Sequence, residues 1–72
     1  MALTKTQITL LEGLKAFQVP KDQTIGIMLF LQNDEQGMQE LINYMASERP
    51  TAYEIIKESV KIVTKKITNH EA

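Results

Sequence analysis

Few side chains in this 72-residue chain could do chemistry, and they are dispersed. The one histidine, His70, stands near the C-terminus, and the absence of cysteine excludes disulfides and thiolate zinc sites. Asp34 and Glu35 are adjacent carboxylates, but they stand at a predicted helix start, where acidic side chains stabilise the helix dipole. The glycines are isolated, and no calcium-loop spacing occurs. We therefore predict a protein that is not an enzyme, with no catalytic residue, cofactor or metal.

Lysine side chains are the second group that could carry a function, by binding an anionic partner. Lys57, Lys61 and Lys65 recur at four-residue spacing, which places them along one ridge of a helix, and Lys66 follows directly. The ridge suits an acidic protein partner, a phosphate backbone or the acidic helix of a second copy. A solvated helix face is the other interpretation.

A helix-turn-helix DNA reader is a further alternative, with two helices joined at Asn33-Asp34. Its second helix would present Gln36 and Gln39, whose side chains can hydrogen-bond to adenine. However, residues 34–48 contain several acids and no lysine or arginine, so repulsion from phosphates opposes this docking. Nucleic acid therefore remains possible, through the lysine ridge, but it is not the favoured partner.

The elements that must position these side chains are predicted helices. Thr4 with Gln7, and Thr51 with Glu54, have the three-residue spacing of a capping box. Asp34 is a suitable N-cap for a third helix. Apolar residues recur with helical periodicity between these signals. The predicted fold is all-α, either a small four-helix bundle or an orthogonal helical array, in one domain with helices at about 5–17, 20–32, 34–47 and 52–68 and a tail at 69–72.

Residues 25–31 are apolar almost without interruption. A helix turns about 100° per residue, so apolar side chains point all round its axis here and must be covered. A buried strand is the alternative, although it has no pairing partner elsewhere in this chain, unless two copies pair with each other. Since a chain this short has a marginal core, a second subunit is the expected support. We predict a homodimer whose interface includes either Ile27 and Phe30 or Met28 and Leu31.

The composition is that of an ordinary globular domain, with 43% hydrophobic and 24% charged residues. The formal net charge of −1 gives no general attraction to nucleic acid or to anionic membranes. The longest apolar run is far shorter than the roughly 20 residues of a membrane span. We therefore expect a cytoplasmic protein that does not bind membranes.

Three segments carry a resemblance: residues 19–31 (VPKDQTIGIMLFL), 33–36 (NDEQ) and 40–44 (ELINY). Together they are similar to short uncharacterised helical proteins of Gram-positive and gut bacteria. The resemblance implies a small helical fold and a bacterial source, and it assigns no activity and no functional residue. The sequence thus indicates a protein-interaction module, with a nucleic-acid-binding transcriptional regulator as the alternative.

Overall fold

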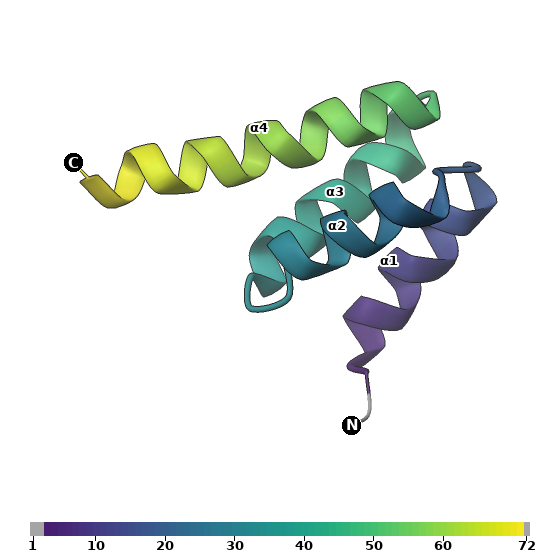
Figure 1. The fold of residues 1–72 in the computed structure, drawn as a ribbon, viewed down its shortest axis with the longest axis horizontal. Helices are drawn as coiled ribbons and strands as arrows, with labels where there is room; N and C mark the ends of the chain where they lie inside the picture. The colour runs from purple at the N-terminus through teal and green to yellow at the C-terminus, as the bar shows by residue number, and fades with distance from the viewer. Residues whose placement is uncertain (1–2, 72) are drawn as a thin grey trace.

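The computed structural model describes the backbone of residues 3–71 and the side chains of residues 3–65. Four helices follow one another, and no strand occurs within the described backbone (Figure 1). They are α1 (Lys5–Ala16), α2 (Lys21–Phe30), α3 (Glu35–Glu48) and α4 (Ala52–Glu71). The predicted all-α fold is confirmed as a small helical bundle, and the strand interpretation of residues 25–31 is wrong.

Both predicted capping boxes are present. At the start of α1, Thr4 Oγ1 accepts the backbone N–H of Gln7 at 3.1 Å, and Gln7 Oε1 accepts the backbone N–H of Thr4 at 2.8 Å. At the start of α4, Thr51 and Glu54 exchange the equivalent bonds at 3.2 and 2.9 Å. Each box therefore satisfies two backbone donors that a helix leaves without a partner at its N-terminus.

The other helix ends differ from the predicted ranges by a few residues. Pro20 is the N-cap of α2 rather than its first helical residue, because its ψ of 148° is extended. Helix α2 ends at Phe30, two residues earlier than predicted. Helix α4 continues to Glu71, so the predicted end at residue 68 is wrong. Residues 66–71 contain neither proline nor glycine, and Asn69, a residue type that often follows a helix end, does not end this helix. Ala72 lies outside the described residues.

The chain leaves α1 through a left-handed residue, Gln18, whose φ is 62°. The backbone N–H of Gln18 donates to the carbonyl of Lys15, and that of Val19 donates to the carbonyl of Leu14, each at 3.0 Å. This pair of bonds is a Schellman motif, which normally has glycine at the left-handed position. The motif turns the chain so that Val19 enters the core.

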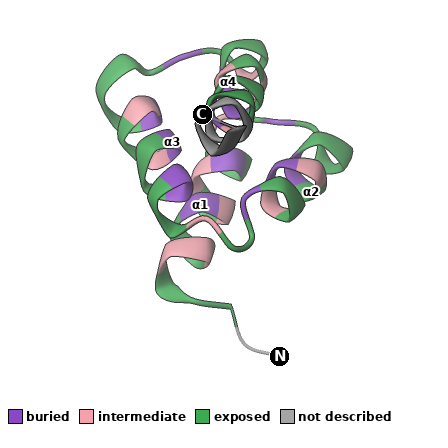
Figure 2. Cartoon of the chain, turned by 90° about the vertical axis from the view of Figure 1, so that its left-hand side faces the viewer, coloured by how far each residue is buried: buried purple, intermediate pink, exposed green. Residues whose placement is uncertain are grey.

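The core lies where the four helices meet (Figure 2). Helix α1 packs most extensively on α3. Helix α2 packs on α1, α4 packs on α3, and α2 and α4 also contact each other. The C-terminal half of α4 extends past the other helices (Figure 1). The described core consists of Leu10, Leu14, Val19, Ile27, Leu31, Met38, Leu41, Met45, Ile55 and Ile62.

Candidate interaction surface

Helix α2 buries one side of its apolar stretch and exposes the other. Ile27 is 3% exposed and Leu31 is fully buried, so these two predicted interface residues lie in the core. Met28 is partly buried and packs against the same core. Of the four predicted interface residues, only Phe30 is largely exposed, at 64%.

Three large apolar side chains share the outer side of α2. Ile25 is 49% exposed and Leu29 is 58% exposed, and the two are four residues apart on one side of the helix. Phe30 lies about 100° further round the axis than Leu29, four residues after Gly26. Gly26 lies among them. We call Ile25, Gly26, Leu29 and Phe30 the outer α2 face. Single exposed apolar residues are normal on a protein surface, whereas a contiguous group of them indicates a contact site.

The three glycines of the chain have different surroundings. A methyl group at Gly13 would lie 3.0 Å from Met45 Cε, and one at Gly37 would lie 3.2 Å from Ile62 Cγ2. These two glycines therefore allow close helix packing. A methyl group at Gly26 would meet no atom within 4 Å. Nothing in the described fold requires glycine at that position.

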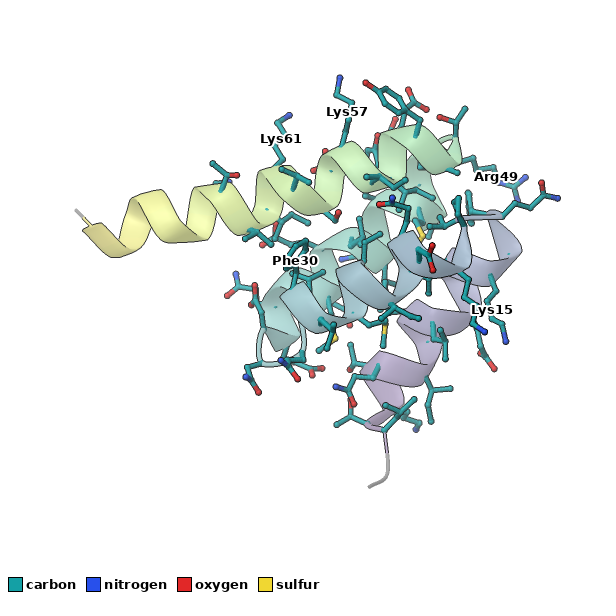
Figure 3. The ribbon with its side chains drawn as sticks, viewed as in Figure 1. Lys15, Phe30, Arg49, Lys57 and Lys61 are labelled. Atoms are coloured by element: carbon teal, nitrogen blue, oxygen red, sulfur yellow. The ribbon has the colours of Figure 1, made fainter. Side chains whose placement is uncertain are left out.

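The lysine ridge lies on the solvent side of α4. Lys57, Lys61 and Lys65 are all exposed, and Lys57 and Lys61 point away from the other helices (Figure 3). The Lys57 ammonium lies 5.6 Å from the centre of the Tyr53 ring, a cation–π distance. The side chain of Lys66 lies outside those described. The ridge is therefore accessible to an anionic partner.

A shallow groove of about 660 Å³ runs beside the ridge. Tyr44 of α3 borders it, together with Ile56 and Val60 of α4. Burial raises the pKa of the Tyr44 phenol above its ordinary value of 10.0, and the nearby carboxylates of Glu54, Glu58 and Glu48 raise it further. Tyr44 therefore keeps its proton at neutral pH and can act as a hydrogen-bond donor in this groove.

Asp34 and His70, which the sequence offered as residues capable of chemistry, have different outcomes. The Asp34 carboxylate accepts the backbone N–H of Gly37 at 2.9 Å, the capping role predicted for it. The side chain of His70 lies outside those described. Among the side chains of residues 3–65, no group of three acidic or histidine residues is arranged to hold a metal ion.

Sequence reasoning missed Ile25 and Leu29 as surface residues. A usable signal was present, because Asp22 precedes Ile25 by three residues and Gly26 by four, which puts a charged residue on the same face. A charge on one side of an otherwise apolar helix indicates the side that faces water.

Neither the hydropathy of the helices nor comparison with known proteins assigns a function to this chain. In the described part of the chain, every helix is too short or too polar to cross a bilayer. Comparison with protein-family models, with curated proteins and with solved structures finds no match to this chain.

Proposed function

We propose that this chain is a non-enzymatic protein-interaction module that associates as a homodimer through the outer α2 face. The observation that supports the proposal is the exposure of three large apolar side chains, Ile25, Leu29 and Phe30, within two turns of one short helix. Removing such apolar surface from water is the main favourable contribution to most protein associations. A cytoplasmic setting, predicted from the sequence, belongs to the same proposal.

The size of the face indicates how strong the association is. An apolar patch of this kind covers a few hundred Å², less than the roughly 800 Å² that each partner buries in a standard stable interface. The proposed dimer is therefore weak and reversible. Its mass must be followed from about 1 µM to about 1 mM, the concentration range in which weak interfaces become occupied.

Sedimentation velocity over this range tests the proposal. The average mass of the native protein is expected to rise from that of a monomer towards that of a dimer. Leu29→Asp should remove the rise, because an isolated carboxylate would be buried in the contact. Val60→Asp is the matched control, since Val60 is 51% exposed on α4 and lies outside the face. A monomer at every concentration, or equal behaviour of the two variants, contradicts the proposal.

An acidic protein or a nucleic acid bound by the lysine ridge is the second candidate. The outward direction of Lys57 and Lys61 favours it (Figure 3), while the acidic residues elsewhere and the net charge of −1 oppose it. Retention of DNA or RNA should weaken as salt rises, and Lys57→Glu with Lys61→Glu should abolish it. Absence of salt-dependent retention excludes nucleic acid.

A further inference from the structure

Gly26 has no structural reason within the described fold, although it stands in the interior of α2. Glycine disfavours a helix because its backbone loses more freedom on folding than any other residue. Gly13 and Gly37 each have a close neighbour that leaves little room for a methyl group, whereas Gly26 has open space above it. Open space above a glycine, bordered by exposed apolar side chains, is a hollow that an incoming apolar side chain can fill.

The same face carries projections that fit this hollow. Leu29 follows Gly26 by three residues and Phe30 follows it by four, and both are more than half exposed. Gly26 and Leu29 lie at equal distances along the helix from the midpoint between Ile27 and Met28, one on each side. If a two-fold axis passes beside this midpoint, perpendicular to the helix, a second α2 runs antiparallel to the first. Gly26 of each copy is then level with Leu29 of the other.

Charge favours this orientation over a parallel one. Asp22 lies at the N-terminal end of the outer α2 face, and a parallel pair would bring two Asp22 side chains together. An antiparallel pair separates them by about 16 Å along the axis, at roughly 1.5 Å per residue. It also places the positive end of each helix dipole beside the negative end of the other.

Charge also favours a second copy over a charged partner. Residues 23–33 contain no acidic or basic side chain, so the centre of the face offers nothing to select an acidic or a basic protein. Its hollow and its projections are instead complementary to each other under two-fold symmetry. An isologous dimer needs this kind of self-complementary patch.

Resting on the homodimer proposed above, we infer that two copies pair antiparallel through α2, with Leu29 of one copy against Gly26 of the other and Phe30 of one copy level with Ile25 of the other. Gly26 is then the position that allows the two helix backbones to approach closely. The occupant of the outer α2 face is then a second copy of this chain, bound in antiparallel orientation.

Two substitutions that add leucine to an exposed helix surface test the hollow. Gly26→Leu should leave the monomer folded and raise its melting temperature, because the site is open and leucine favours a helix. It should nevertheless weaken dimerisation at least tenfold in sedimentation velocity. Ala46→Leu, at an exposed site on α3, is the matched control and should leave dimerisation unchanged. Dimerisation that is unchanged or strengthened by Gly26→Leu overturns the inference.

Cysteine cross-linking tests the orientation, and the absence of natural cysteine gives a clean background. Two Leu29→Cys chains should form a disulfide, since antiparallel pairing leaves these residues about 4–5 Å apart along the axis. Two Asp22→Cys chains should not, since about 16 Å exceeds the roughly 7 Å between Cα atoms that a disulfide spans. Rapid linking through Asp22→Cys would show a parallel dimer and overturn the orientation, with the homodimer itself intact. A native protein that stays monomeric overturns both proposals.

Discussion

Replacing Gly37 with alanine should destabilise the fold, although alanine is the better helix former. A Cβ atom at Gly37 would lie 2.7 Å from Asp34 Cγ and 3.2 Å from Ile62 Cγ2, and it would overlap Asp34 Oδ2. The first two distances are shorter than ordinary contacts between these atoms. The Asp34 carboxylate would therefore have to leave the position in which it caps α3.

The change in the free energy of unfolding caused by Gly37→Ala is the sum of three contributions. Loss of an N-cap side chain costs about 1 kcal/mol. Crowding of Ile62, which packs α4 on α3, costs about 1 kcal/mol more, at the low end of overpacking in a core. The higher helix propensity of alanine returns about 1 kcal/mol. The net loss is about 1 kcal/mol, which lowers the melting temperature of a chain this size by roughly 4–8 °C.

Urea unfolding followed by circular dichroism measures the effect. Gly26→Ala is the matched control, because its methyl group meets no atom within 4 Å and should stabilise α2 by about 0.5–1 kcal/mol. In an Asp34→Ala background the loss from Gly37→Ala should be smaller, because the main clash is gone and the two changes are not additive. If Gly37→Ala were as stabilising as Gly26→Ala, the contact described between Asp34, Gly37 and Ile62 would be wrong.

Three further outcomes can be checked on the same protein. Gln18→Gly and Arg49→Gly should each raise the free energy of unfolding by about 0.5–1 kcal/mol, because both residues have positive φ and glycine adopts it without strain; a loss in either urea titration would contradict this. Leu14→Ala, at a fully buried site, should lower the free energy of unfolding by about 2–5 kcal/mol. A decrease below about 1 kcal/mol would place Leu14 outside the core. The Tyr44 phenol should titrate above pH 10.0 in the difference between the ultraviolet absorbance of the native protein and that of Tyr44→Phe. Because the folded pKa lies above the unfolded one, the stability from Tyr44 is present below pH 10.0 and is lost as pH rises through the folded pKa; a midpoint at or below 10.0 would refute the raised pKa.

The helix starts were predictable because their signals are local. A capping box depends on two side chains three residues apart, so Thr4 with Gln7 could be recognised without knowledge of the rest of the fold. The end of α4 was less predictable, since residues 66–71 contain neither glycine nor proline. Gln18 at a left-handed position was also hard to foresee, because glycine usually occupies it.

The exposed side of α2 was not evident from residue types alone. Ile25 and Ile27 are the same amino acid two positions apart, yet Ile25 is 49% exposed and Ile27 is 3% exposed. Which of the two is covered depends on where α1 and α4 cross the helix, and this is set by contacts between distant parts of the chain. Asp22 was the local signal for the solvent side, and it indicates a direction rather than an extent of burial.

The first three turns of α4 hold this helix to the rest of the fold. Its buried residues within the described side chains, Ile55, Ser59 and Ile62, all belong to its first three turns. Backbone amides in these turns should exchange with deuterium only when the whole domain unfolds. A truncation or an insertion within these three turns should therefore unfold the whole domain and not the helix alone.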